Sequence, residues 1–296
     1  MRSVTLSVER GETLCIVGES GCGKSLTALA IMGLLPRRTR RTASRLALDG
    51  IDLMAASDGE LADLRGSRMA MIFQEPMTSL NPCYTVGNQM EEMLLRHRKA
   101  RRREARDRAV QLLEKVGMTA AASRLEQYPH QLSGGLRQRV MIAMVMMCNP
   151  DLIIADEPTT ALDVTIQAQI LLLLAELRRE FGMGLILITH DLGIVARIAD
   201  RVAVMYAGQI VEEGTVSAVF GQPLHPYTRG LMNCIPVPGK VARGSRLGSI
   251  PGMVPSLIGT LSGCSFRERC DFRQPECEAD IALTAATAGH ARRCIL

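Results

Sequence analysis

The feature that most constrains this chain is a glycine-rich loop of eight residues between a predicted strand and a predicted helix. Residues 13–17 are a short apolar run, and residues 26–35 form a helix-compatible apolar stretch that ends before Pro36. The loop consists of Gly18, Glu19, Ser20, Gly21, Cys22, Gly23, Lys24 and Ser25. In this context glycines let backbone N–H groups surround phosphates, Lys24 neutralises the terminal phosphates, and the Ser25 hydroxyl reaches Mg²⁺. The sequence therefore predicts a nucleotide-phosphate site in an α/β fold.

Two adjacent carboxylates follow a second apolar strand further along the chain. Residues 152–155 predict the strand, and Asp156 and Glu157 end it. Doubly wound sheets place their ligands at the C-terminal ends of strands, so Asp156 is suited to the Mg²⁺ shell. Glu157 is suited to orient and deprotonate an attacking water. An ordinary strand end with acidic loop residues would fit the same pattern, but the phosphate loop upstream favours the catalytic interpretation.

The order of apolar runs indicates how the chain is organised. A predicted helix at 164–181 separates the strand at 152–155 from another at 184–189, which is the βαβ rhythm of a buried parallel sheet. Residues 83–150 read as a helical subdomain. From about residue 236 the composition shifts to Pro, Gly and Cys. We predict an α/β domain over 1–235 and a small extension over 236–296.

A third motif opens a helix with a serine and two glycines. It consists of Ser133, Gly134 and Gly135, whose N–H groups would lie at a positive helix end able to bind a phosphate. In isolation it could be an ordinary helix cap. However, it lies between Gln74 and the acidic strand, and Asp163 and His190 follow. This order resembles the ABC ATPase family, and the resemblance implies a RecA-like nucleotide-binding core.

The resemblance also implies roles for these residues. Residues 133–135 of one subunit would complete the ATP site formed by the phosphate loop of a partner, so that two chains enclose two ATP molecules with Mg²⁺. Gln74 would sense Mg²⁺ and the membrane partner, and Asp163 would act at the dimer seam. His190 would contact the terminal phosphate, although a lone histidine after a strand is more often structural.

Two segments resemble the dipeptide and oligopeptide importer branch more closely, namely 74–82 (QEPMTSLNP) and 224–228 (LHPYT). Nickel and glutathione importers of the same branch carry similar segments, and loop packing alone would also explain them. The resemblance implies import of peptides driven by ATP hydrolysis. It also implies a second ABC ATPase subunit, favoured as a paralogue, two membrane permease subunits and, indirectly, a substrate-binding protein. By the same resemblance, selectivity for the solute would rest with the membrane subunits and the external binding protein.

Other classes fit less well. Arginine-rich stretches at 37–45 and 96–108 would suit a DNA-associated ABC ATPase. Such proteins need long coiled coils or large insertions between the motifs, for which 18–190 leaves no room. The net charge of +5 is also too small to argue for nucleic acid. A translation-factor ABC protein normally carries two cassettes, whereas one is present here.

The longest apolar run, residues 140–148, has nine residues, whereas a membrane span needs about 20. The first residues also lack the apolar stretch of a secretory signal. We therefore expect a cytoplasmic protein, peripheral on the inner face of the membrane.

Four of the nine cysteines lie in the last 33 residues: Cys264, Cys270, Cys277 and Cys294. Four thiolates are a usual ligand set for zinc or an iron–sulfur cluster. The gaps of five, six and sixteen residues are longer than those typical of structural zinc and favour a 4Fe-4S cluster. Zinc with His290 in place of one cysteine is an alternative, and four free thiols are another. The resembling importer branch carries similar cysteines.

Cys22 invites a separate expectation. It lies among backbone amides at a helix N-terminus, a setting that lowers the pKa of a thiol. We therefore expect Cys22 to react readily with alkylating reagents and to be protected by ATP.

The start of the chain departs from the family pattern. Only 17 residues precede Gly18, and no Phe, Tyr or Trp occurs before Phe73. ABC ATPases usually stack adenine on an aromatic from a strand ahead of the phosphate loop, so the family's N-terminal strands should be missing. Stacking contributes about 1–3 kcal/mol, so a longer natural form should bind ATP roughly five- to 150-fold more tightly. We expect the natural protein to be longer by a few tens of residues.

Overall fold

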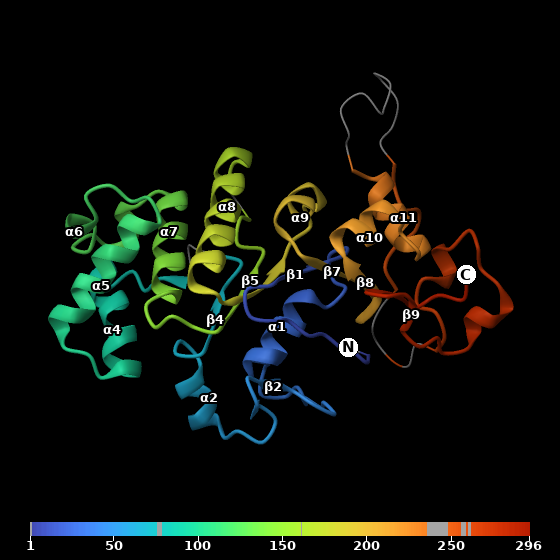
Figure 1. The fold of residues 1–296 in the computed structure, drawn as a ribbon, viewed down its shortest axis with the longest axis horizontal. Coiled ribbons are helices and arrows are strands. Elements are labelled where there is room, and N and C mark those ends of the chain that lie inside the picture. Colours follow the sequence, from blue (N-terminus) through green and yellow to red (C-terminus); the bar gives the residue numbers. More distant parts are fainter. Residues whose placement is uncertain (1, 76–78, 161, 236–247, 256–258, 260–261) are drawn as a thin grey trace. The chain divides into compact units, whose positions relative to one another are not determined.

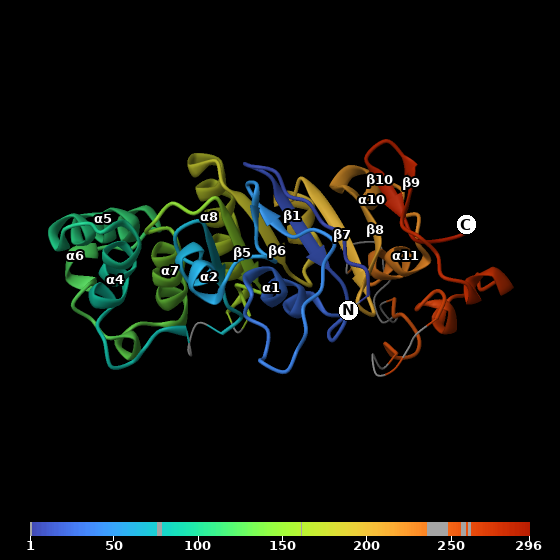
Figure 2. The ribbon, with the colours of Figure 1, turned by 90° about the horizontal axis from the view of Figure 1, so that it is seen from below.

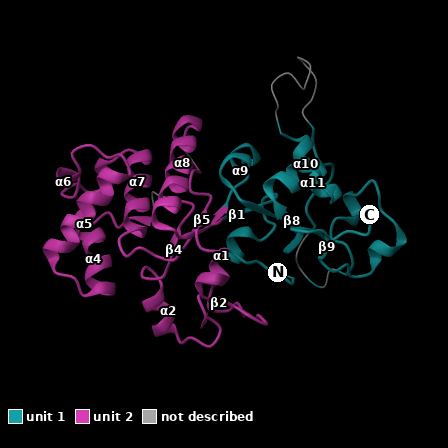
Figure 3. Ribbon diagram, viewed as in Figure 1, with its two compact units in different colours: residues 1–8, 13–27, 188–296 teal, residues 9–12, 28–187 magenta. Residues whose placement is uncertain are grey.

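The computed structural model describes residues 2–75, 79–160, 162–235, 248–255, 259 and 262–296. The chain divides into two compact units, which Figure 3 colours separately. Unit 1 comprises residues 1–8, 13–27 and 188–296, and unit 2 comprises residues 9–12 and 28–187. The predicted boundary at residue 236 lies outside the described residues. No helix in the described part of the chain is long and apolar enough to cross a membrane.

Unit 1 contains the strand order β1-β7-β8-β10-β9. The bounds are β1 Thr13–Val17, β7 Arg201–Tyr206, β8 Gln209–Thr215, β9 Thr284–Thr287 and β10 His290–Arg292. Strands β1 and β7 are parallel, and the other pairs are antiparallel. All five residues of β1 are buried, which is the continuous apolar pattern of a strand covered on both faces. The end of the chain therefore completes the same sheet that begins at residue 13.

The remaining elements of unit 1 are short helices (Figure 1). They are α9 Leu192–Ile198, α10 Val216–Gly221, α11 Pro226–Asn233, and the 3-10 helices η2 Arg267–Arg269 and η3 Pro275–Glu278. Helix α1, Lys24–Met32, begins in unit 1 and ends in unit 2. The N-terminus of α11 is fixed by proline at its first position and by the His225 ring, whose Nδ1 accepts the Tyr227 N–H at 3.1 Å.

Unit 2 contains the strand order β4-β5-β6. The bounds are β4 Met69–Ile72, β5 Leu152–Asp156, β6 Gly184–Ile188, and the hairpin β2 Ala47–Leu48 with β3 Ile51–Asp52. Strands β4 and β5 are parallel, with Ile72 opposite Ala155. Every residue of β4, β5 and β6 is buried, and each fully buried Leu or Ile contributes about 1.5–3 kcal/mol. The predicted α/β class is therefore confirmed.

The helices of unit 2 include two whose starts the sequence predicted, α7 at Gly134 and α8 at Val164. They are α2 Asp58–Leu64, α4 Val86–Arg98, α5 Arg102–Lys115, α6 Ala121–Arg124, η1 Pro129–Gln131, α7 Gly134–Val145 and α8 Val164–Phe181. Figures 1 and 2 show α4, α5, α6 and α7 gathered in one group within the range predicted to be helical. Helix α8 has the predicted bounds because Asp163 accepts the Ile166 N–H at 3.0 Å and Gly182 ends it with φ 64°.

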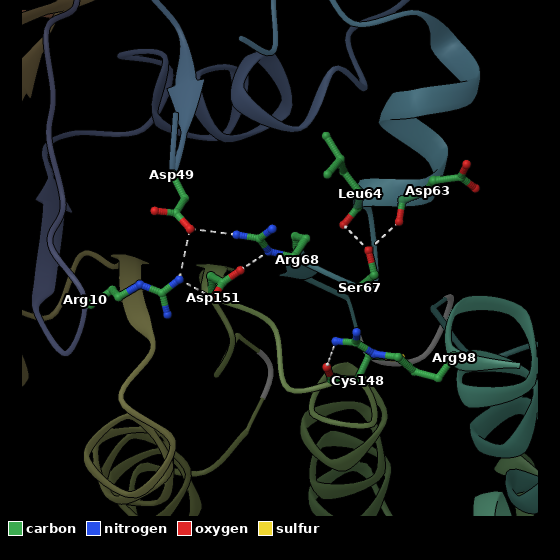
Figure 4. Close-up of polar contacts among 9 residues, drawn as sticks. All are labelled: Arg10, Asp49, Asp63, Leu64, Ser67, Arg68, Arg98, Cys148 and Asp151. Carbon is green, nitrogen blue, oxygen red and sulfur yellow. Dashed lines mark hydrogen bonds and ion pairs between the residues drawn. The ribbon is translucent and has the colours of Figure 1, made fainter. Parts of the chain in front are cut away.

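Part of the arginine-rich range 96–108 joins these helices. Glu91 in α4 is 4% exposed, and its carboxylate pairs with Arg102 Nε at 3.2 Å and Arg106 Nη1 at 3.4 Å. Arg98 donates to the carbonyl of Cys148 at 2.9 Å, as Figure 4 shows. At these positions the arginines hold α4, α5 and the end of α7 together, which the sequence did not reveal.

A four-residue ion-pair cluster joins separate segments of unit 2 (Figure 4). Asp151, just before β5, pairs with Arg68 and, at 2.7 Å, with Arg10. Asp49 in the β2–β3 turn pairs with the same two guanidinium groups, at 2.8 Å to Arg68 and 3.2 Å to Arg10. Burial acts to raise the pKa of Asp151, but Arg68 and Arg10 outweigh it and hold that pKa below its ordinary value.

The cluster should make the stability of the protein depend on pH in the acid range. A carboxyl whose pKa is lowered by folding stabilises the protein above its unfolded pKa, and this contribution is lost as pH falls through the folded value. At pH 7 we expect Asp151→Asn to lower the free energy of unfolding by about 1–3 kcal/mol. The difference should shrink below about pH 4, as measured by urea unfolding across pH.

Asp107→Asn is the matched control, because its carboxylate is 67% exposed and lies 4.0 Å from Arg103. We expect this variant to stay within about 0.5 kcal/mol of the wild type. A deficit of Asp151→Asn that is constant from pH 7 to pH 3 would contradict the electrostatic account and indicate lost packing instead.

Candidate functional site

The glycine-rich loop connects β1 to α1 and is shaped by the β7–β8 hairpin. A Cβ atom at Gly18 would lie 2.1 Å from the Met205 carbonyl oxygen, so no larger residue fits there. The hairpin turns at Ala207 and Gly208, both with positive φ (44° and 77°), as in a type I′ turn. The Gly208 N–H donates to the carbonyl of Cys22 at 2.8 Å. The hairpin therefore fixes the loop at its start and at its fifth residue.

Lys24 lies inside the curve of this loop. It is 6% exposed, and its ammonium donates to the carbonyl of Gly18 at 2.8 Å and to that of Glu19 at 3.1 Å. Carbonyls of the first two loop residues thus hold the positive charge, and Lys24 itself begins α1, at the positive end of the helix dipole. Ser25, the second residue of α1, is half-buried. This arrangement can bind an anion such as a phosphate.

Cys22 does not have the environment that the sequence suggested. Its side chain is fully buried, and burial raises the pKa of its thiol despite the nearby ammonium of Lys24, whose Nζ lies 3.9 Å from Sγ. The expectation of a reactive thiolate is therefore wrong. Desolvation by the surrounding loop outweighs the favourable charge, because an isolated thiolate away from water is costly.

The loop contacts two residues that the sequence did not link to it, one of which, Tyr227, belongs to the importer-like segment 224–228. The Glu19 N–H donates to the phenolic oxygen of Tyr227 at 2.8 Å, and the Glu19 carboxylate pairs with Arg269 at 2.8 Å. Tyr227 and Arg269 lie 208 and 250 positions after Glu19 in the sequence. No pattern in the sequence links them to the loop, because the contacts depend on how α11 and the extension pack in the folded chain.

His190 follows β6 and belongs to unit 1. The backbone on its N-terminal side is fixed because the Thr189 N–H donates to Ile16 at 3.3 Å. On its C-terminal side Asp191 caps α9 by accepting the Ile194 N–H at 3.1 Å. The His190 residue itself is exposed. It is presented at the surface on a segment held at both ends.

Unit 2 brings Gln74 and Glu157 together. They follow the parallel neighbours β4 and β5, and Gln74 Nε2 donates to Glu157 Oε2 at 3.5 Å. Thr160, which the sequence did not indicate, donates to the same oxygen at 3.2 Å. Asp156, at the end of β5, is 5% exposed. A carboxylate held by an amide and a hydroxyl beside a buried carboxylate is suited to base and cation chemistry.

The backbone at Glu157 adds a further constraint. Its φ of 45° lies in the left-handed region, which costs a residue other than glycine about 1–2 kcal/mol. Such strain persists where the surroundings impose it, and it is frequent at functional sites. Here the left-handed backbone turns the chain after β5, and the Glu157 carboxylate accepts hydrogen bonds from Gln74 and Thr160.

The serine and two glycines at 133–135 open α7 in unit 2. Ser133 caps the helix and accepts the Leu136 N–H at 3.4 Å. A Cβ at Gly134 would lie 3.5 Å from Leu162, and one at Gly135 would lie 3.3 Å from Ile166. These contacts place the motif beside the segment that carries Asp163, which caps α8. Ser133 and Asp163 are both exposed.

The predicted residues therefore fall into two sets. Unit 1 carries the phosphate loop and His190, and unit 2 carries the others: Gln74, Ser133, Gly134, Gly135, Asp156, Glu157 and Asp163. Residues 76–78 of the importer-like segment and Ala161, two positions before Asp163, lie outside the described residues.

The cysteines of the extension do not form the metal site that was expected. Among the described residues, no group of three or more His, Cys, Asp or Glu side chains is placed to hold a metal ion, and Cys264, Cys270, Cys277 and Cys294 are all free thiols. The 4Fe-4S cluster and zinc are therefore not supported.

His290, the alternative zinc ligand, has a different role. It is 5% exposed, and its Nε2 lies 2.8 Å from Oε1 of the fully buried Glu212. A buried carboxylate needs hydrogen-bond partners, and His290 supplies one of them. Its ring is therefore committed to the β8–β10 contact.

Two protein families match parts of this chain. Residues 1–160 match the family described as ABC transporter, and residues 211–277 match the C-terminal region of oligopeptide/dipeptide transporters. The dipeptide transport ATP-binding protein DppD of Bacillus subtilis is 51% identical over 279 residues, covering 94% of this chain and 83% of that protein. The Escherichia coli protein of the same name is 50% identical over 293 residues, covering 98% and 89%.

A solved structure is also similar. It is the dimeric, post-hydrolysis state of the ATP-binding cassette MJ0796 bound to ADP and Pi, with a TM-score of 0.64 and 30% identity. The match covers 72% of this chain and 89% of that chain. The predicted RecA-like fold with a phosphate-binding loop is consistent with this neighbour.

The burial of Cys22 leads to a labelling prediction. Cys22 is fully buried with a raised thiol pKa, whereas Cys83 is exposed. Under native conditions we expect a maleimide to label Cys83 well before Cys22, as read by mass spectrometry of peptides. Cys83→Ser should remove the early label and leave Cys22 unlabelled until the protein unfolds. Equal rates at the two thiols would show that Cys22 is accessible after all.

Proposed function

The chain belongs to the ABC transporter family of ATP-binding subunits, and from this premise we propose that it hydrolyses ATP to drive import of di- or oligopeptides. The proposal of hydrolysis depends on one observation above all: Glu157 is held at the end of β5 by Gln74 and Thr160. The peptide substrate is supported by the match of residues 211–277 and by relatives about half identical along nearly the whole chain.

In the proposed reaction Glu157 is the general base. A water attacks the γ-phosphorus as the bond to the bridging oxygen of the β-phosphate breaks, the proton passes to Glu157, and ADP leaves. The bonds from Gln74 and Thr160 keep the carboxylate in one orientation. His190, exposed on a fixed segment, would donate to an oxygen of the terminal phosphate.

The phosphates and their cation are assigned to the remaining residues. The backbone amides of residues 18–25 and the Lys24 ammonium would hold the β- and γ-phosphates. The Ser25 hydroxyl, the Asp156 carboxylate and the Gln74 amide oxygen are hard oxygen donors, which is the ligand chemistry that Mg²⁺ prefers. When bound, Mg²⁺ would neutralise charge on the phosphates. The Nε2 of Gln74 already donates to Glu157, so its amide oxygen is the atom suited to the cation.

We propose that the exposed motif of unit 2 completes the ATP site of a second subunit. Ser133 and Asp163 are exposed, as a motif that completes the site of a partner must be. The dimeric form of the MJ0796 cassette supports this arrangement. The partner would be a paralogous ATPase, and two permease subunits would hold both at the inner face of the membrane, with a substrate-binding protein acting indirectly.

A metal at the extension is kept as a separate proposal. Burial raises the pKa of the Cys264 thiol, and negative charge on Cys277, Cys294 or Cys270 would raise it further. Cys264 N–H also donates to the Cys277 carbonyl at 2.8 Å. Rearranged thiolates would suit a 4Fe-4S cluster, and zinc is the alternative.

Glu157→Gln should separate binding from hydrolysis. The variant keeps Lys24, Ser25 and Asp156, so ATP should still bind and hold the two ATPase subunits together. Turnover in the assembled transporter should fall below about a tenth of the wild-type rate, because a general base contributes about 10²–10⁴-fold. Glu176→Gln, at an exposed position of α8, is the matched control and should hydrolyse ATP normally. Residual activity above that level would remove Glu157 from its role.

The substrate is tested in the same reconstituted transporter. A binding protein loaded with a dipeptide should stimulate ATP hydrolysis and drive uptake of the peptide. Stimulation by nickel or glutathione, without any by peptides, would reassign the transporter within its branch.

Metal analysis decides the proposal for the cysteines. Protein purified without oxygen should contain iron and sulfide and absorb broadly in the visible range, and Cys270→Ser or Cys277→Ser should abolish both. Stoichiometric zinc without iron would select the zinc site. Absence of both metals would leave four free thiols.

A further inference from the structure

Glu19, the second residue of the phosphate loop, is held from outside the loop. Its carboxylate oxygens pair with both terminal nitrogens of Arg269, at 2.8 Å and 3.1 Å. Its N–H donates to the phenolic oxygen of Tyr227 at 2.8 Å. A guanidinium and a carboxylate joined by two parallel bonds are fixed in both distance and plane. Side chain and backbone of Glu19 are therefore both anchored to segments near the C-terminal end.

Arg269 is itself immobile in this position. Its side chain is 4% exposed. Its Nε donates to Pro251 at 2.8 Å and its Nη2 to Ile250 at 3.1 Å, both at carbonyl oxygens. The guanidinium also lies 5.8 Å from the ring centres of Tyr206 and Phe266. Its buried charge is balanced by Glu19, and removing either member of such a pair leaves an uncompensated charge.

An aromatic cluster connects this anchor to the hairpin behind the loop. Tyr206 at the end of β7 lies 4.6 Å from Tyr227 and 5.2 Å from Phe266, between ring centres. Tyr227 and Phe266 are 5.4 Å apart. Tyr206 follows Met205, whose carbonyl lies against Gly18. The hairpin, α11 and the extension thus converge on one side of the phosphate loop.

We propose that Arg269 and Tyr227 are positioning residues for ATP, which hold Glu19 so that the phosphate loop keeps its binding conformation. Glu19 is connected to the phosphate-binding lysine by one further hydrogen bond, because its carbonyl oxygen accepts a hydrogen bond from the Lys24 ammonium at 3.1 Å. The extension therefore acts on nucleotide affinity. This inference rests on the proposed function, since it assigns to this loop the binding of ATP phosphates.

Electrostatics explains why the anchor matters. A carboxylate one residue from the start of a phosphate loop would repel the phosphates if it were turned toward them. Arg269 neutralises this charge and directs it away from the loop interior. Losing Arg269 both loosens Glu19 and leaves its negative charge unpaired. The step affected is therefore binding, whereas Glu157, in the other unit, keeps its own partners.

A double-mutant cycle on the full-length chain tests the inference. Arg269→Gln should weaken equilibrium binding of a fluorescent ATP analogue about tenfold, or about 1.4 kcal/mol. Glu19→Gln combined with Arg269→Gln should recover most of that loss, because no orphan carboxylate remains. In the assembled transporter the KM for ATP should rise with Arg269→Gln while kcat at saturating ATP changes less than about twofold. Wild-type affinity in the folded Arg269→Gln variant would overturn the proposal.

Two further variants guard against a purely structural effect. Tyr227→Phe keeps the buried ring and removes only the hydroxyl that accepts the Glu19 N–H, so affinity should fall about fivefold with little change in thermal unfolding. Arg273→Gln is the control, because Arg273 is 45% exposed and pairs with Glu268 and Glu278 within the extension. It should bind ATP normally. Lower thermal stability with unchanged affinity of the folded Arg269 and Tyr227 variants would make these residues structural only.

The outcomes also separate this inference from the proposed function. A wild-type chain that binds no ATP would refute the function itself. A wild-type chain that binds and hydrolyses ATP, with Arg269→Gln indistinguishable from it, would refute the positioning role alone.

Discussion

A fully buried carboxylate, Glu212, joins the parts of unit 1 on which the phosphate loop depends. It accepts the N–H groups of Leu224 and His225 at 2.8 Å each, and its Oε1 pairs with His290 Nε2 at 2.8 Å. Burying an ion costs several kcal/mol unless such partners replace its water. Strand β8, the start of α11 and strand β10 are thereby tied together. Burial lowers the pKa of His225 to about 3, so its neutral ring caps α11, the helix that presents Tyr227 to Glu19.

Local signals fixed by backbone chemistry were readable from the sequence. The phosphate loop, the apolar strands and the bounds of α8 follow from glycine spacing, continuous burial and the cap at Asp163. These features depend on neighbours in the chain, and short-range patterns describe them well. The pairing of Gln74 with Glu157 was not predicted, because it depends on β4 and β5 being neighbours in the sheet, which the sequence alone does not show.

Other features depend on contacts between distant segments and left no pattern in the sequence. Cys22 looked activated because the amides and Lys24 near it are visible in the sequence, whereas the burial that raises its pKa depends on the fold around it. His290 looked like a metal ligand because Glu212, 78 residues away, is not visible as its partner. Arg102 and Arg106 belong to an arginine-rich stretch that would suit DNA binding, whereas in the structure both pair with the buried carboxylate of Glu91. In each case a charge or a thiol was judged without its desolvation.

The position of the extension also depends on contacts between segments that are distant in the sequence. Its composition, rich in Pro, Gly and Cys, suggested a separate appendage, yet β10 pairs with β8 and Arg269 reaches the second residue of the phosphate loop. A buried ion pair contributes little net stability compared with apolar packing, but it is specific in geometry. Apolar packing alone would hold the extension in place without fixing the orientation of Glu19. The bidentate pair, set among Tyr206, Tyr227 and Phe266, therefore orients the Glu19 carboxylate more than it adds stability, and it ties the glycine-rich loop of unit 1 to a residue of the extension.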